Sequence, residues 1–202
     1  MDAKRFSRHA IFLGLIVLGL SGCSSAPCDK YLKTPLYIPP QKLVKVPKPL
    51  NVIRRREYDI CILQTHGVQV IRLGQTWTLV FPSDELFNND TAEINEDYKS
   101  LLNTAADLMQ TYSKITVAVT GYSDRDDDVK TKFGSIKDEL TERQAESVAN
   151  YLVSRHINSR LIYGVGRGSR DPVAWNGSPE SRRYNRRVEV SFRYYRNNTA
   201  WY

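Results

Sequence analysis

The chain has 202 residues, of which 41% are hydrophobic and 25% charged, and its formal net charge is +7 at pH 7. This length excludes an assembly of several large domains, because it fits one domain with room for an additional segment. The modest basic excess suits an anionic partner, but it does not choose among nucleic acid, lipid and cell wall.

The N-terminal residues form a targeting segment. Three basic side chains within the first eight residues precede an apolar run of ten, residues 11–20, which is too short for a membrane-spanning helix of about 20 residues. Residues 20–23 (Leu-Ser-Gly-Cys) resemble the lipobox of bacterial lipoproteins. We therefore expect residues 1–22 to be a lipoprotein signal peptide and Cys23 to carry covalent lipid. The alternative is an ordinary secretory signal with a chance cysteine.

The residue after Cys23 is Ser24 and not Asp. By resemblance to lipoprotein sorting in Gram-negative bacteria, this predicts an outer-membrane lipid anchor with the domain in the periplasm. Acyl chains contribute about 0.8 kcal/mol per buried methylene, so several chains together hold a protein stably. Export argues against a nucleic-acid partner. Apart from the lipid, we expect no cofactor.

Residues 23–56 read as the lipidated N-terminus and a proline-rich tether, because six of the nine prolines lie at residues 27–49. Proline disfavours helices and central strands, so the segment is expected to be extended. One interpretation is a spacer that holds the domain away from the membrane. The other, favoured by apolar residues within 43–46, is a strap along a partner. The basic run at residues 54–56 is either solvated or a partner contact.

Two cysteines remain after Cys23 is assigned to lipid. In an oxidising compartment Cys28 and Cys61 can form a disulfide, which would join the tether to the domain. In the chain-entropy model such a bridge stabilises the fold by roughly 3–4 kcal/mol. The alternative is two thiols, with Cys61 a small core residue in a predicted strand.

Residues 57–196 carry the periodicity of a folded domain, followed by a short tail at residues 197–202. Runs of apolar and alternating residues predict six strands, at residues 58–64, 68–73, 76–81, 114–121, 160–165 and 187–194. Helical spacing of apolar residues predicts two helices, at residues 92–112 and 140–156. Helices placed between strands that must pair at a distance indicate an α/β (α+β) two-layer sandwich.

Four short motifs occur in order in the second half of the chain. They are Thr-Gly-Tyr-Ser-Asp at residues 120–124, Leu-Thr-Glu-Arg-Gln-Ala at 140–145, Gly-Val-Gly at 164–166 and Asn-Arg-Arg-Val-Glu-Val at 185–190. Together they resemble the OmpA-like C-terminal domain, the peptidoglycan-binding module of outer-membrane proteins and lipoproteins. The resemblance covers about residues 79–194. It implies a mixed sheet with helices packed on one face.

The same resemblance implies a binding site for diaminopimelate in the stem peptide of peptidoglycan. Asp124 would accept from the ligand's ammonium, and Ser123 matches the family's threonine. An arginine of the following helix would grip a carboxylate of the same residue. This chemistry fits a zwitterion, because a guanidinium matches a carboxylate in two hydrogen bonds. The alternative interpretation of Asp124 is a helix or loop cap.

The helix departs from the family pattern at the arginine position, where this chain has Gln144. Arg143 lies one residue early. At 100° per residue, Gln144 flanks the core face and Arg143 points toward solvent. Lys137 replaces the family's asparagine. Arg182 or Arg187 can supply the missing positive charge, although Arg187 is also typical of a strand-surface salt bridge.

Neither catalysis nor metal binding is indicated. Residues 126–128 are all aspartate, but they lack the glycine and terminal glutamate of a calcium loop. The signal contains one histidine, and the remaining two, His66 and His156, sit in a predicted turn and at a helix end. No Cys-His or Ser-His-Asp arrangement is recognisable.

A finer resemblance covers residues 67–74 and 79–87, which look like the OmpA-like lipoprotein of the Dot/Icm type IVB secretion system. The first hypothesis is a binding module that ties a secretion core in the outer membrane to peptidoglycan, with other envelope subunits as partners. The second is a structural subunit whose wall pocket has been lost. The third is a stand-alone envelope tether of the Pal type.

Overall fold

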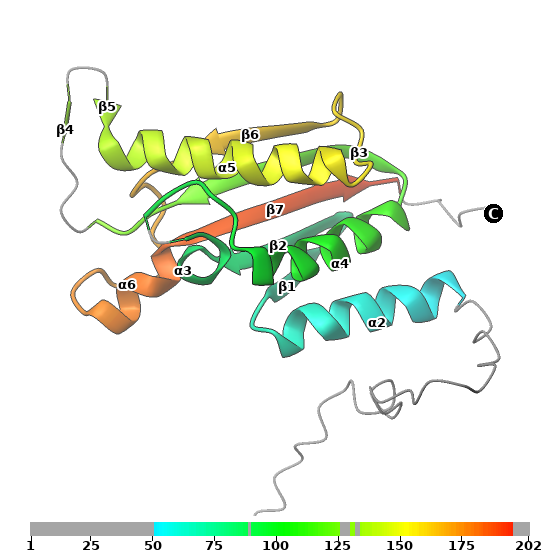
Figure 1. Ribbon diagram of the computed structural model, residues 1–202. Helices are drawn as coiled ribbons and strands as arrows, with labels where there is room; N and C mark the ends of the chain where they lie inside the picture. Colours follow the sequence, from blue (N-terminus) through cyan, green and yellow to red (C-terminus); the bar gives the residue numbers. More distant parts are fainter. Residues whose placement is uncertain (1–50, 89, 126–129, 132–133, 196–202) are drawn as a thin grey trace, which may run out of the picture.

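The computed structural model describes residues 51–88, 90–125, 130–131 and 134–195, which form a sheet with helices beside it (Figure 1). In chain order the elements are α2 (Val52–Thr65), β1 (Gln69–Leu73), β2 (Thr76–Pro82), α3 (Ser83–Leu86), the 3-10 turn η1 (Glu96–Tyr98), α4 (Lys99–Gln110), β3 (Lys114–Tyr122), β4 (Lys130–Thr131), β5 (Gly134–Ser135), α5 (Ile136–Ser154), β6 (Ile162–Gly166), α6 (Pro179–Asn185) and β7 (Arg187–Tyr194).

Several predicted features lie outside the described residues. They are the signal peptide, the lipidation site Cys23, Cys28, most of the tether, the aspartates at residues 126–128 and the C-terminal tail. The pairing of Cys28 with Cys61 therefore stays a prediction. Within the described ranges, no helix is long and apolar enough to cross a membrane.

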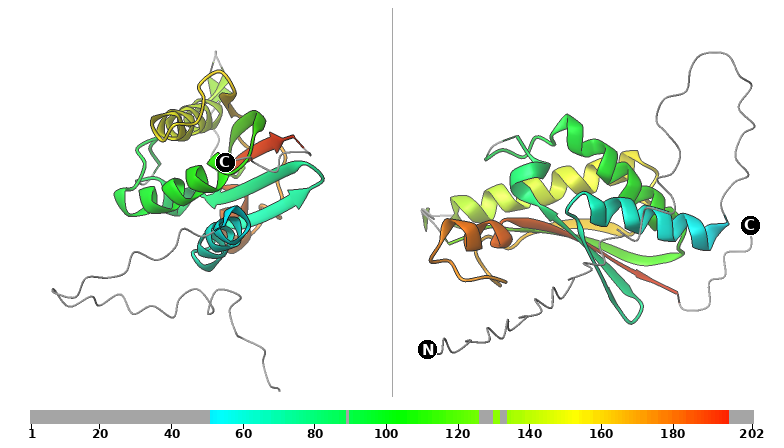
Figure 2. Two further views of the ribbon diagram at one scale, coloured as in Figure 1. Left: turned by 90° about the vertical axis from the view of Figure 1, so that its right-hand side faces the viewer. Right: turned by 90° about the horizontal axis from the view of Figure 1, so that it is seen from below.

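The main sheet has five strands in the order β1-β2-β7-β3-β6. Strands β3 and β6 are parallel, and the other neighbours are antiparallel, so the sheet is mixed. Helices α4 and α5 lie along one face (Figure 2). This arrangement confirms the predicted two-layer fold with helices packed on one face of a mixed sheet.

The core lies between that face and the helices. Alternate residues of the three central strands are buried, which is the period-two pattern of a sheet with one covered face. The buried apolar residues of these strands are Trp77, Leu79, Phe81, Val117, Val119, Val188, Val190, Phe192 and Tyr194. Helices α4 and α5 add Leu102, Leu108, Met109, Val148 and Leu152. Each large side chain buried in this way stabilises the fold by roughly 1.5–3 kcal/mol.

The strand predicted at residues 58–64 is wrong, because these residues belong to helix α2. Asn51 caps the helix through its side chain, which accepts from the Arg54 amide at 2.9 Å. The helix packs against α4 and so belongs to the folded domain. It begins at Val52, which is before residue 57, the predicted start of the domain. Cys61 and Leu63 are buried at alternate positions, so this short apolar run satisfied strand spacing and helix packing alike.

The basic run at residues 54–56 lies on α2 and makes contacts within the domain. Arg55 pairs with Asp107 at 3.3 Å. Arg56 donates to the Thr111 hydroxyl at 2.9 Å, and its guanidinium lies 3.7 Å from the ring centre of Tyr112. These contacts join the first described helix to the end of α4.

The other helix predictions need adjusted ends. Helix α5 begins at Ile136 and not at residue 140, because the Ser135 hydroxyl caps it by accepting from the Asp138 amide at 3.0 Å. The helix predicted at residues 92–112 shortens to α4, preceded by η1. The short elements α3 and α6 were not predicted, since four and seven residues carry little periodicity.

Helix α5 approaches the sheet at glycines. A Cβ atom on Gly121 of β3 would lie 2.3 Å from the Thr141 carbonyl oxygen, and one on Gly166 of β6 would lie 2.5 Å from the Glu142 amide nitrogen. Gly164 is similarly close to the backbone of Glu146, at 2.9 Å. Only residues without a side chain let the helix backbone rest on the strands at this distance.

Gly121→Ala should therefore destabilise the domain, by about 1–3 kcal/mol, because the methyl group must push α5 away from β3. The midpoint of urea unfolding measures the change. Gly67→Ala is the control, since Gly67 has open space around its Cβ position but a φ of +82°. Backbone strain alone should make it cost about 1 kcal/mol. An equal or smaller loss for Gly121→Ala would contradict the close contact.

Asp59 is a buried carboxylate on α2. It is 5% exposed, and its Oδ2 atom has no hydrogen-bond partner among the described residues. Burial raises the pKa of Asp59 to about 6, the nearby Arg55 opposes the rise, and the negative charge of Asp107 adds to it. Because the folded state favours the protonated form, the carboxylate lowers stability as the pH rises from about 4 to about 6.

Asp59→Asn should raise the free energy of unfolding at pH 7.5, by about 1–3 kcal/mol, because the amide stays neutral when buried. The gain should vanish below about pH 4, where the wild-type carboxyl is protonated in both states. Unfolding curves at pH 4, 5, 6 and 7.5 test this. Glu146→Gln, on the exposed face of α5, is the control and should show no such pH dependence. A gain independent of pH would contradict the assignment.

Candidate functional site

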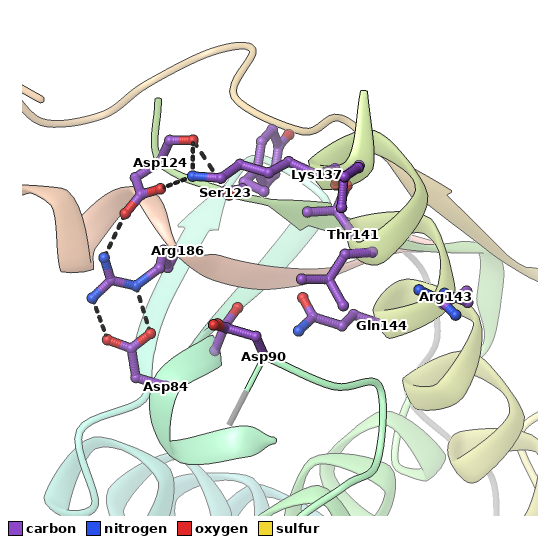
Figure 3. Close-up of a pocket in the computed structure, with 13 residues that line it drawn as sticks. Asp84, Asp90, Ser123, Asp124, Lys137, Thr141, Arg143, Gln144 and Arg186 are labelled. Carbon is purple, nitrogen blue, oxygen red and sulfur yellow. Dashed lines mark hydrogen bonds and ion pairs between the residues drawn. The ribbon is translucent and has the colours of Figure 1, made fainter. Parts of the chain in front are cut away.

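A polar cavity of about 600 Å³ opens where β3 ends and α5 begins (Figure 3). The start of α3 and the residue preceding β7 complete its wall. The lining residues are Ser83, Asp84, Asp90, Tyr122, Ser123, Asp124, Ile136, Lys137, Leu140, Thr141, Arg143, Gln144 and Arg186. The cavity thus contains the motif at the end of β3 and the start of the α5 motif, which the sequence placed together by resemblance.

The loop after β3 is held by backbone and amide contacts. The Ser123 amide donates to the Gly168 carbonyl at 2.8 Å, and the Arg125 amide donates to the Asn176 side chain at 3.1 Å. The fully buried Asn185 donates to the same Asn176 oxygen at 3.0 Å. The connection between β6 and α6, together with the last residue of α6, therefore fixes the position of the aspartate between Ser123 and Arg125.

Asp124 lies at the centre of the charged groups. Its side chain is only 6% exposed, and each of its oxygens accepts from a different cation: Oδ1 from Lys137 Nζ and Oδ2 from Arg186 Nη1, both at 2.5 Å. Burial opposes the ionisation of Asp124. The hydrogen bonds and positive charges of Lys137 and Arg186 outweigh it and hold the pKa of this carboxyl below its usual range.

Arg186 connects Asp124 to a second carboxylate. Its Nε and Nη2 atoms donate to the two oxygens of Asp84, each at 2.6 Å, in a bidentate pair. Hydrogen bonding to Asp84 and Asp124 raises the pKa of Arg186 above its ordinary value, although partial burial opposes the rise. Lys137, Asp124, Arg186 and Asp84 therefore form a row of alternating charges along one wall of the cavity (Figure 3).

The positive charge expected from Arg182 or Arg187 comes instead from Arg186 and Lys137. Neither Arg182, on α6, nor Arg187 lines the cavity. Arg187 is buried on the other face of the sheet. Its Nε atom donates to Glu189 Oε1 at 2.7 Å, and its guanidinium lies 3.9 Å from the ring centre of Tyr122. This is the salt bridge that the sequence offered as the alternative.

A period-two signal in the sequence points to Arg186. Val188, Val190 and Phe192 of β7 face the core, so residues in the same register point toward the helices. Arg186 continues that register by one step and reaches the cavity, whereas Arg187 points to the opposite face. The strand predicted at residues 187–194 has this alternation but starts one residue after Arg186, so the prediction did not include Arg186.

Gln144 and Arg143 lie as the helical geometry predicted. Gln144 is 5% exposed, and its Nε2 atom donates to the Thr91 carbonyl at 2.8 Å. Arg143 is exposed at the rim, and its guanidinium lies 3.9 Å from Glu139. The position where the family resemblance expects an arginine thus carries a neutral amide that is held by the loop before η1.

Two further groups give the cavity polar character. The Ser83 hydroxyl is buried in the cavity wall and has no hydrogen-bond partner within the part of the chain that the structure describes. Asp90 is exposed at the opening. Fixed groups of both signs in one cavity can bind a ligand that carries an ammonium and a carboxylate. Among the described residues, no three His, Cys, Asp or Glu side chains gather as a metal site would require.

Comparisons with known proteins agree with this architecture. The chain is 30% identical over 125 residues to the probable lipoprotein YiaD of Escherichia coli (strain K12), which covers 62% of this chain and 55% of that protein. It is 39% identical over 105 residues to the peptidoglycan-binding protein ArfA of Mycobacterium tuberculosis (strain ATCC 25618 / H37Rv), covering 52% and 30% respectively. The chain spans about half the length, or less, of these relatives.

A solved structure shares the fold. The cell wall anchor of the T6SS from Pseudomonas aeruginosa matches with a TM-score of 0.61 and 28% identity, over 71% of this chain and 97% of that one. The model of the OmpA family matches residues 86–186, which is half of the sequence and includes the cavity motifs. The chain belongs to the OmpA family.

Proposed function

We propose that this protein is an outer-membrane lipoprotein whose OmpA-like domain binds peptidoglycan non-covalently through the stem peptide and so anchors an envelope complex to the wall. The observation that carries the proposal is the cavity around Asp124, in which a nearly buried carboxylate and the two cations Lys137 and Arg186 line one opening. Two matched proteins, one named as a peptidoglycan-binding protein and the other as a cell wall anchor, support the proposal that this domain binds the wall.

Diaminopimelate, the zwitterionic residue of the stem peptide, fits the charges of this cavity. Its ammonium needs a carboxylate, which the family resemblance assigns to Asp124. Its carboxylate needs a cation or several hydrogen-bond donors. Arg186 is held at the cavity wall by Asp84, and the hydroxyls of Ser83 and Ser123 lie in the same wall. These groups take the part that the family gives to the helix arginine.

The membrane end of the proposal depends on Cys23. A lipid on this residue, followed by the proline-rich tether, would place the domain in the periplasm within reach of the wall. The match to a probable lipoprotein supports this arrangement. The resemblance of residues 67–74 and 79–87 to the Dot/Icm lipoprotein supports a type IVB secretion core as the anchored complex, with its envelope subunits as further partners.

A second candidate function is that of a structural subunit whose cavity does not bind the wall. The observation that favours it is the saturation of Asp124 by Lys137 and Arg186, together with the neutral Gln144. A third, a stand-alone tether of the Pal type, differs only in having no partner complex. Photo-cross-linking from residues 43–46 distinguishes these two, because secretion subunits are captured in the second case and absent in the third.

Asp124→Asn should lower binding of the purified chain to isolated sacculi by about tenfold, because the ligand's ammonium loses its carboxylate. Co-sedimentation at increasing sacculus concentration measures the apparent affinity. Asp97→Asn removes an exposed carboxylate outside the cavity and should leave binding unchanged. If the wild-type chain stays in the supernatant, or if Asp124→Asn binds equally well, the structural-subunit function replaces wall binding.

Cys23→Ser should abolish incorporation of radioactive palmitate when the full precursor is made in a Gram-negative host. The unlipidated chain should also leave the outer-membrane fraction on sucrose-gradient separation. Cys28→Ser is the matched control and should keep both the label and the membrane fraction. Retention of label by Cys23→Ser would refute the assignment of the anchor to this cysteine.

A further inference from the structure

Lys137 occupies the position at Asp124 that an incoming ammonium needs. It lies in the first turn of α5, and its side chain extends to Asp124 along the cavity wall (Figure 3). Its Nζ atom donates to Asp124 Oδ1 at 2.5 Å and to the Asp124 carbonyl oxygen at 3.3 Å. The group that Asp124 holds is therefore a primary ammonium on an aliphatic chain.

The same chemistry defines the ligand of the proposed function. Diaminopimelate also presents a primary ammonium on an aliphatic chain. The Lys137 side chain therefore places the same chemical group at Asp124 as the ligand would. The Asp124 side chain is only 6% exposed, and its second oxygen is occupied by Arg186. An ammonium from outside therefore reaches the carboxylate only after one of the two resident cations has moved.

Of the two cations, Lys137 is the one that can leave. Arg186 is held on its other side by two hydrogen bonds to Asp84, so its removal would break three contacts. Lys137 has a flexible stem, and within the described residues its ammonium donates only to Asp124. Its side chain is 19% exposed. Its ammonium can rotate into solvent while Arg186 continues to neutralise Asp124.

We propose that Lys137 sets the affinity of the cavity by acting as a tethered competitor for the ligand's ammonium. The inference rests on the proposed wall binding and adds a property of this chain, since Lys137 stands where the family has an uncharged asparagine. A group that is part of the chain competes at a high effective concentration. Only the fraction of molecules in which Lys137 has swung away is competent to bind, which lowers the apparent affinity by that fraction.

This role predicts that removing the ammonium strengthens binding. Lys137→Asn should increase the apparent affinity of the full chain for purified sacculi by about tenfold, as expected when about one molecule in ten has an open site. Lys137→Met keeps an aliphatic stem without the charge and should show the same gain. Lys99→Asn removes a partly exposed lysine that does not line the cavity, and it should change nothing.

A double variant links the gain to Asp124. Lys137→Asn combined with Asp124→Asn should bind no better than Asp124→Asn alone, because no carboxylate is left to be exposed. The thermal midpoint of each variant is measured in parallel. If Lys137→Asn does not fold, Lys137→Met provides the comparison, since its stem retains the packing of the lysine against the cavity wall.

The outcomes separate this inference from the proposed function. If the wild-type chain binds sacculi and neither Lys137 variant binds more tightly, the competitor role is overturned while wall binding stands. Weaker binding by both variants also overturns it, since Lys137 then contacts the ligand directly. If neither the wild-type chain nor the variants bind, both ideas fail. Binding by the variants alone supports the competitor role and shows that the wild-type site is closed.

Discussion

Helix α5 lies so close to strands β3 and β6 that Gly121, Gly164 and Gly166 leave no room for a Cβ atom between helix and sheet. This contact fixes the height of the helix above the strands. It also fixes where the first turn of α5 meets the end of β3, and that meeting point is the cavity. Because the helix lies this close to the sheet, Lys137 reaches Asp124. The angular position of Gln144 on the helix directs it into the wall of the same cavity. The glycines of the sheet therefore determine the geometry of the cavity through the position of α5.

The second feature that determines the properties of the cavity is the order of charged side chains along its wall. Asp124 is nearly buried, and a carboxylate in that position is stable only when cations accompany it. Arg186 and Lys137 meet this need in different ways: one is held in a bidentate pair with Asp84, and the other is a single flexible ammonium. The same charges that stabilise the fold around Asp124 therefore control whether the carboxylate is accessible from outside.

The chain has the fold of the OmpA family, and two residues that line its cavity depart from the family pattern. A neutral amide stands at the helix position where the resemblance expects arginine, and a lysine stands where it expects asparagine. The two changes act together, because the positive charge is moved from the middle of α5 to its first turn, next to Asp124. Counted over these two positions, the number of positive charges is the same as in the family pattern.

The sequence by itself determined the family, the five strands of the main sheet, the burial of alternate residues and the orientation of Gln144 and Arg143 on their helix, because each depends on local periodicity or on a short motif. It also predicted the lipid anchor, which lies outside the described residues and stays a prediction. Only the tertiary structure decided that residues 58–64 are helical, since their short apolar run suits either element until α4 packs against it. Only the tertiary structure brought Arg186 to Asp124 and Asp84, which lie 62 and 102 residues away. Those partners meet because β7 inserts between β2 and β3, and pairing at such a distance leaves no pattern in a single sequence.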